Sequence, residues 1–137
     1  EKIGGFVWRD ALSLNVAQMD HQHMRLIEIG NAIIEHLNKD VDRDGLAGVM
    51  NALVEYTQEH FAAEEDLMSL YHYPETDTHR SIHKDLVRQI MEYGERARTG
   101  EVPEKAAFLE FFETWLARHI LDEDRKYGLF LNSKGVY

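Results

Sequence analysis

The chain has 137 residues, no cysteine and a formal net charge of -10. This length predicts one domain with its own core, and the absence of cysteine excludes disulfides and thiolate metal sites. The acidic balance argues against binding to nucleic acid and against contact with anionic membranes. No run approaches the ~18 apolar residues of a membrane span, and we find no signal-peptide pattern. A cytoplasmic protein is therefore expected.

The composition indicates a compact helical protein, with 2 prolines and 9 glycines in a chain that is 44% hydrophobic. Residues 1–19 show no helical period, and their apolar residues Leu12, Leu14 and Val16 alternate. Because no partner strand follows, we interpret this segment as an extended N-terminal arm that packs against the rest of the protein.

Four amphipathic segments then follow, and a short helix is expected within 122–131. Asp20 is the expected N-cap of the first segment, Pro74 ends the second and Gly100 ends the third. Pro103 lies near the start of the fourth. The expected helices span residues 20–38, 43–72, 75–99 and 103–121. We predict an all-α, up-down-up-down four-helix bundle with a short C-terminal helix, in a single domain of residues 1–137.

Histidines and carboxylates recur on the apolar faces of these segments at spacings typical of metal ligands. The pairs His60/Glu64 and His79/His83 are each four residues apart, so both members of a pair leave the same helix face. Asp124 follows His119 by five residues, which does not match one face of an α-helix. The fourth helix must therefore loosen or end after His119. The full candidate set is His23, His60, Glu64, His79, His83, His119 and Asp124.

Such a cluster would be costly in a protein core unless metal ions supplied the balancing charge. Imidazole and carboxylate ligands without thiolate suit iron or zinc. Seven ligands are too many for one tetrahedral zinc, and they suit two octahedral ions with two carboxylate bridges and an open position. A single pair of this kind is more often an ordinary surface pair, so the prediction depends on all the pieces together. We interpret the other histidines, His21, His36 and His72, as solvent-facing or capping residues.

In order and spacing these motifs resemble the hemerythrin family over nearly the whole chain. The matching pieces are Asp20 and Gln22 before His23, then His60 to Glu64, His79 to His83, and His119 to Asp124. The resemblance implies that His79, His83 and His119 bind one iron ion, and that His23 and His60 bind a second, five-coordinate one. Glu64 and Asp124 would bridge the two irons together with an oxo or hydroxo group.

The resemblance also implies that dioxygen binds at the open iron position and leaves as dioxygen. An apolar pocket would exclude water and anions that promote oxidation. Its implied lining residues are Trp8, Leu26, Phe61, Trp115, Leu116, Ile120 and Tyr127.

Bacterial members of the family include stand-alone proteins and domains at the ends of chemotaxis receptors. The start at Glu1 and the loose segment 1–5 favour a domain excised from a longer chain. The chain resembles the C-terminal cytoplasmic domain of a methyl-accepting chemotaxis receptor, whose signalling region would then be its partner. Oxygen sensing and signal transduction are the expected role.

Oxygen storage or delivery, iron handling, and a di-iron oxidase or peroxidase remain the alternatives. Ferritin-like enzymes use more carboxylates. A set of five imidazoles and two carboxylates therefore favours binding over catalysis, and we do not expect an enzyme.

Overall fold

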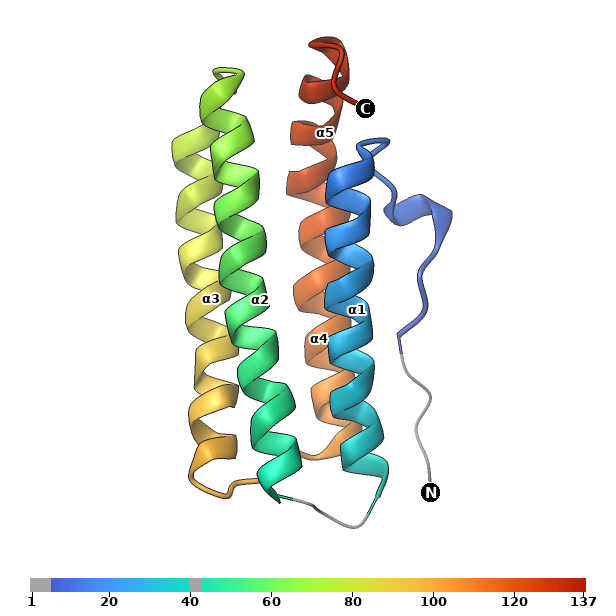
Figure 1. Ribbon diagram of the computed structural model, residues 1–137, viewed down its shortest axis with the longest axis vertical. Coiled ribbons are helices and arrows are strands. Elements are labelled where there is room, and N and C mark those ends of the chain that lie inside the picture. Colours follow the sequence, from blue (N-terminus) through green and yellow to red (C-terminus); the bar gives the residue numbers. More distant parts are fainter. Residues whose placement is uncertain (1–5, 40–42) are drawn as a thin grey trace.

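The computed structural model describes residues 6–39 and 43–137, and these ranges form a bundle of long helices (Figure 1). Residues 1–5 of the expected arm and residues 40–42 of the first interhelical turn lie outside the described residues. The elements in order are η1 (Asp10–Leu12), α1 (Ala17–Asn38), α2 (Arg43–Leu70), α3 (Thr76–Arg98), α4 (Lys105–His119), η2 (Ile120–Asp124) and α5 (Arg125–Ser133).

Successive helices run in opposite directions, α5 extends the line of α4, and the N-terminal arm lies beside α1 (Figure 1). Helix α2 packs between α1 and α3, and α4 closes the bundle against α1. The predicted all-α, four-helix architecture is thus confirmed. None of the helices in the described ranges has both the length and the apolar character that crossing a membrane would require.

Helix α1 begins at Ala17, earlier than expected, and its N-cap is Val16 rather than Asp20. The expectation that Asp20 is the N-cap is therefore wrong. The Asp20 carboxylate instead accepts hydrogen bonds from the Ser13 hydroxyl and, at 2.8 Å, from the Leu14 amide. Asp20 thereby fastens the arm to the first turn of α1.

The arm packs against the bundle as an extended segment with one 3-10 turn. Its residues Leu12, Leu14 and Val16 are all buried. Farther along the bundle, the Asn31 side chain pairs with the backbone of Phe6, accepting from its amide at 2.7 Å and donating to its carbonyl at 2.8 Å. These contacts hold the arm along α1.

Local signals explain where the later helices begin and end. Helix α2 ends at Leu70, and His72 then adopts a left-handed conformation (φ 58°) just before Pro74. Helix α4 begins at Lys105, later than expected, because the Glu104 carboxylate caps it and accepts from the Ala107 amide at 2.8 Å.

The half of the bundle remote from the α2–α3 turn is filled by apolar side chains, with Phe108 and Phe112 fully buried. A Cβ atom on Gly30 would lie 2.4 Å from the Phe112 ring, so α1 and α4 approach closely at a position where only glycine fits. This packing fixes the relative positions of the helices that carry the polar cluster in the other half.

Candidate metal centre

A turn of π-helix brings Asp124 onto the same side as His119. Five residues of regular α-helix would end about 140° away from the starting face. In η2 the backbone widens, and the Arg125 amide donates to the Ile120 carbonyl. His119 Nε2 then lies 3.0 Å from Asp124 Oδ1. The predicted loosening of the fourth helix after His119 is confirmed, and such π-turns are frequent at functional sites.

All seven candidate ligands meet in the bundle interior, and none is more than 7% exposed. They form two overlapping groups, within each of which the candidate ligand atoms lie within 4.8 Å of one another. One group adds His79, His83 and His119 to the two carboxylates, and the other adds His23 and His60 to the same carboxylates.

Glu64 turns a different oxygen to each group. Its Oε1 lies 2.9 Å from His83 Nε2 and 3.8 Å from His79 Nε2. Its Oε2 lies 3.4 Å from His60 Nε2 and 3.7 Å from His23 Nε2. A carboxylate placed in this way could bridge two metal ions.

The two carboxylate oxygens of Asp124 are likewise divided between the two groups. Its Oδ1 lies 3.0 Å from Nε2 of both His79 and His119, whereas its Oδ2 lies 3.2 Å from His23 Nε2. The two carboxylates thus stand between a three-histidine group and a two-histidine group.

Many polar atoms of this cluster have no hydrogen-bond partner within the described part of the chain. They are both ring nitrogens of His23 and His119, Nε2 of His60 and His83, both carboxylate oxygens of Glu64, and Oδ2 of Asp124. Buried polar atoms are normally paired, and leaving them unpaired is costly. The donor set of imidazole and carboxylate therefore fits two bound metal ions, with iron among the metals that such ligands suit.

Without metal, the cluster must balance its charge internally. Burial alone would raise the pKa of Glu64, but His60, His23 and His79 hold it well below its usual range. Burial and Glu64 likewise act to raise the pKa of Asp124, yet contacts with His119 and His23 keep it far below the ordinary value. Both carboxylates are therefore ionised in the interior.

The imidazoles supply the compensating protons. Burial lowers the pKa of His23, but the nearby carboxylates of Asp124 and Glu64 outweigh it and raise the pKa to about 9. His79 has the same causes and the same pKa of about 9. In His60 burial prevails and the pKa is lowered. Metal ions must displace protons from this cluster, so metal affinity should rise with pH.

Two of the histidines have a second partner that fixes their orientation. His60 donates from Nδ1 to the side-chain oxygen of Gln22 at 2.6 Å, and His83 donates from Nδ1 to Glu65 Oε2 at 2.9 Å. These hydrogen bonds place the proton on Nδ1 and turn Nε2 to the cluster. Sequence reasoning missed Glu65. Its one available signal is an acidic residue directly after the ligand Glu64, on a helix that faces the next pair of histidines.

Among the residues of the predicted apolar pocket, Phe61 and Tyr127 have ring contacts with ligand histidines. The Phe61 ring stacks on His83 with centroids 3.8 Å apart, and the buried Tyr127 ring lies 5.9 Å from His79. Trp115 packs near Phe61 and donates to the Leu86 carbonyl at 3.1 Å. Leu26, Leu116 and Ile120 are buried, and Trp8 is half-buried against the core. That these residues line a dioxygen pocket stays a prediction.

The other histidines lie apart from the two ligand groups. His21 and His72 are exposed, and His36 is half-buried.

Residues 14–130 match the model of the hemerythrin HHE cation binding domain. The chain belongs to the hemerythrin family. It is 32% identical over 124 residues to a bacteriohemerythrin of Stenotrophomonas maltophilia, a match that covers 89% of this chain and 78% of that protein. It is 30% identical over 126 residues to a bacteriohemerythrin of Clostridium acetobutylicum, covering 89% of this chain and 98% of the relative.

Among solved structures, wild-type hemerythrin superposes with a TM-score of 0.83 at 26% identity, covering 92% of this chain and 97% of that one. Hemerythrins hold a di-iron centre and bind oxygen, so this chain is a di-iron, oxygen-binding protein. The family indicated by the four ligand motifs is confirmed.

Proposed function

We propose that this member of the hemerythrin family binds dioxygen reversibly at two iron ions held by the seven clustered side chains. The observation that carries the proposal is the division of the Glu64 and Asp124 oxygens between a three-histidine and a two-histidine group. We also infer that residues 1–137 form a single di-iron domain.

A count of ligands supports an open position on one ion only. Three histidines, two bridging carboxylates and one oxo or hydroxo bridge would complete an octahedral ion at His79, His83 and His119. Two histidines with the same bridges would leave the ion at His23 and His60 five-coordinate. Dioxygen, as a small uncharged ligand, would occupy the remaining position.

The surroundings of the cluster favour binding over catalysis. Three of the predicted pocket residues, Leu26, Ile120 and Phe61, are buried and offer no proton donor. Five neutral imidazoles and two carboxylates bring little negative charge, so they stabilise highly oxidised iron less than carboxylate-rich sites do.

We propose oxygen sensing as the biological role, in a cytoplasmic domain joined to the signalling region of a longer receptor. This finer proposal rests on the resemblance to bacterial chemotaxis-receptor domains. The complete gene tests it. Signalling helices encoded ahead of residue 1 would support sensing, whereas a gene that encodes this domain alone would favour storage or delivery.

Elemental analysis of the purified protein tests the metal site. We expect two irons per chain, with most of the iron lost in Glu64→Ala and none lost in the matched control Glu59→Ala, an exposed position on the same helix. One zinc and no iron in the wild type would overturn the proposal, and full iron occupancy in Glu64→Ala would remove Glu64 from the ligand set.

The absorption spectrum of the reduced, iron-loaded protein in air separates binding from catalysis. A stable oxy absorption supports reversible binding. Rapid consumption of dioxygen with a reducing substrate would instead indicate an oxidase or peroxidase.

A further inference from the structure

In each of the two proposed iron ligand groups, one histidine donates a hydrogen bond from Nδ1, the ring nitrogen that points away from the cluster. The acceptor of this hydrogen bond differs between the two groups. His60 of the two-histidine group donates to Gln22, a neutral amide, at 2.6 Å. His83 of the three-histidine group donates to Glu65, a carboxylate, at 2.9 Å. A hydrogen bond to an anion draws the proton away from the ring more strongly, so the ring becomes a better electron donor to a bound metal.

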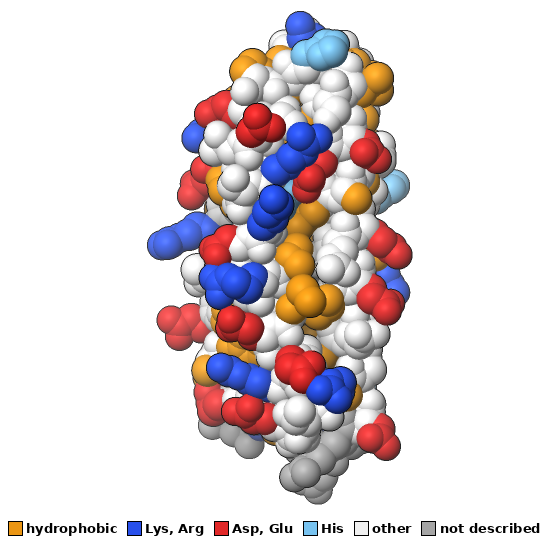
Figure 2. Space-filling model, turned by 90° about the vertical axis from the view of Figure 1, so that its left-hand side faces the viewer, with side chains coloured by type: hydrophobic (Ala, Val, Ile, Leu, Met, Phe, Trp, Pro, Cys, Tyr) orange, Lys and Arg blue, Asp and Glu red, His pale blue; other side chains and the backbone are white. Residues whose placement is uncertain are grey.

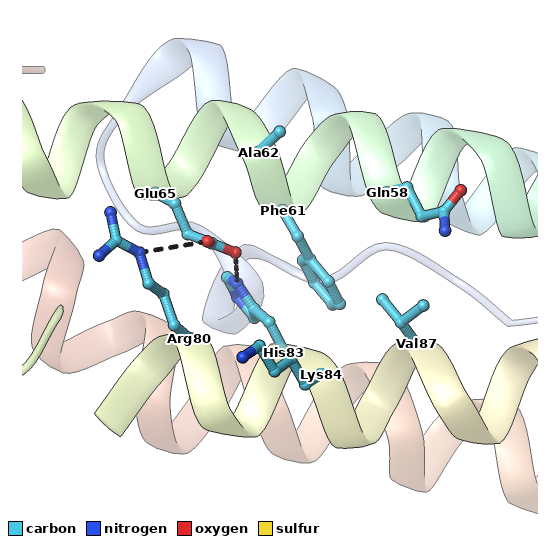
Figure 3. A pocket seen from close by; sticks show the side chains of 8 residues that line it. All are labelled: Gln58, Phe61, Ala62, Glu65, Arg80, His83, Lys84 and Val87. Carbon is cyan, nitrogen blue, oxygen red and sulfur yellow. Dashed lines mark hydrogen bonds and ion pairs between the residues drawn. The ribbon is translucent and has the colours of Figure 1, made fainter. Parts of the chain in front are cut away.

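Glu65 stands between the buried ligand and solvent. It lies on the wall of an open groove of about 310 Å³ between α2 and α3, where Figure 3 shows Arg80, Glu65 and His83 in a row. The Glu65 side chain is 27% exposed, whereas that of His83 is 2% exposed. Solvent therefore reaches the anion but not the ligand, and it screens part of the anion's effect.

Arg80 restrains Glu65 from the other side. Its Nε lies 3.3 Å from Glu65 Oε1, and its guanidinium also donates to the Ser69 hydroxyl at 2.9 Å. The outer surface of this side of the molecule has charged side chains of both signs along an apolar seam (Figure 2). The positive guanidinium partly neutralises the Glu65 carboxylate and so weakens the effect of that carboxylate on the His83 ring.

The His83 ring would keep its position without the charge of Glu65. The Phe61 ring is stacked on it, with an interplanar angle of 2°. Glutamine in place of Glu65 can still accept from Nδ1. The substitution Glu65→Gln therefore separates the charge of this partner from the geometry that it maintains.

We propose that Glu65 is a positioning residue that lowers the reduction potential of the three-histidine ion and favours its ferric state, a bias that Gln22 does not give to the other ion. The inference rests on the proposed di-iron site and adds to it a difference between the two irons. The ion next to Glu65 gives up one electron to an external oxidant more readily, and it accepts one from a reductant less readily, than it would beside a neutral partner.

A potentiometric titration of the iron-loaded protein, followed by its absorption spectrum, tests this role. At a fixed applied potential we expect the ferrous-to-ferric ratio to rise about tenfold in Glu65→Gln, which is about 59 mV for one electron. Gln22→Glu should shift the potential in the opposite direction. The control Asp66→Asn removes the same charge from an exposed neighbour on α2 and should change the ratio far less.

Arg80→Met provides an independent variant that keeps all seven ligands and Glu65. Freed from its cation, Glu65 should pull harder on His83, and the ferrous-to-ferric ratio should fall. Equal potentials in wild type and Glu65→Gln, a Glu65→Gln shift no larger than that of Asp66→Asn, or a rise in Arg80→Met would each overturn the role of Glu65. Wild type with fewer than two irons would instead refute the di-iron site itself, so the two failures are distinguishable.

Discussion

Raising the pH should destabilise the metal-free protein much more than the iron-loaded protein. In the metal-free cluster, the nearby carboxylates of Asp124 and Glu64 outweigh burial and raise the pKa values of His23 and His79 to about 9. Each proton therefore stabilises the folded state. This stabilisation is complete below the unfolded-state pKa of about 6.5 and is lost as the pH rises through about 9.

The expected size follows from the pKa of His23. Its pKa rises by about 2.5, and one pKa unit corresponds to about 1.36 kcal/mol, so the proton on His23 stabilises the folded state by about 3 kcal/mol. His79 interacts with the same two carboxylates, so its contribution does not add in full. The lowered pKa values of Glu64 and Asp124 give stability that is lost only in acid, so they do not change this alkaline step. A loss of about 3 kcal/mol should lower the melting temperature by about 10 °C for a domain of this size.

Thermal melts at about pH 6 and about pH 9.5 measure this effect in both forms. Imidazoles bound to metal are already unprotonated, so the difference between the two melting temperatures should widen at the higher pH. Metal-free Asp124→Asn is the control, because it lacks the carboxylate that contacts both histidines, and its alkaline loss should be smaller. A metal-free protein that is as stable at the higher pH as at the lower one would refute the reasoning.

Three other substitutions test packing, the arm and the pocket. Gly30→Ala should lower the free energy of unfolding by about 1–3 kcal/mol, because its Cβ would lie 2.4 Å from the Phe112 ring, and an unchanged melt would contradict that close packing. Asn31→Ala removes both hydrogen bonds to the Phe6 backbone and should lower the free energy of unfolding by about 1–3 kcal/mol in a denaturant titration. An unchanged free energy of unfolding would mean that the arm is held without these two bonds. Ile120→Ala should admit water and speed the decay of the oxy absorption, and Ile120→Glu should shorten or abolish that absorption with iron retained. Identical decay in all three proteins would mean that Ile120 does not line the pocket.

The seven clustered side chains could be predicted because helical spacing carries their geometry. The four-residue steps of His60/Glu64 and His79/His83 place each pair on one face, and antiparallel helices then bring those faces together. The five-residue step from His119 to Asp124 was informative because it does not place both side chains on one face of an α-helix. It therefore predicted a break, and the structure contains a π-turn there.

Features that depend on tertiary contacts could not be predicted in the same way. Asp20 precedes a periodic run and could cap a helix, but its carboxylate binds the arm, and nothing local decides between the two. Residues adjacent on a helix point in different directions, so only the packing of α3 against α2 reveals that Glu65 reaches His83. The close approach at Gly30 depends likewise on where Phe112 lies.

The most direct test of the central claim is the quantity of dioxygen taken up and returned by the reduced, iron-loaded protein. We predict that each di-iron site binds one dioxygen, with an oxy absorption that appears in air and disappears under argon over repeated cycles. Uptake without return, or continuous consumption of dioxygen in the presence of a reductant, would contradict reversible binding at this site.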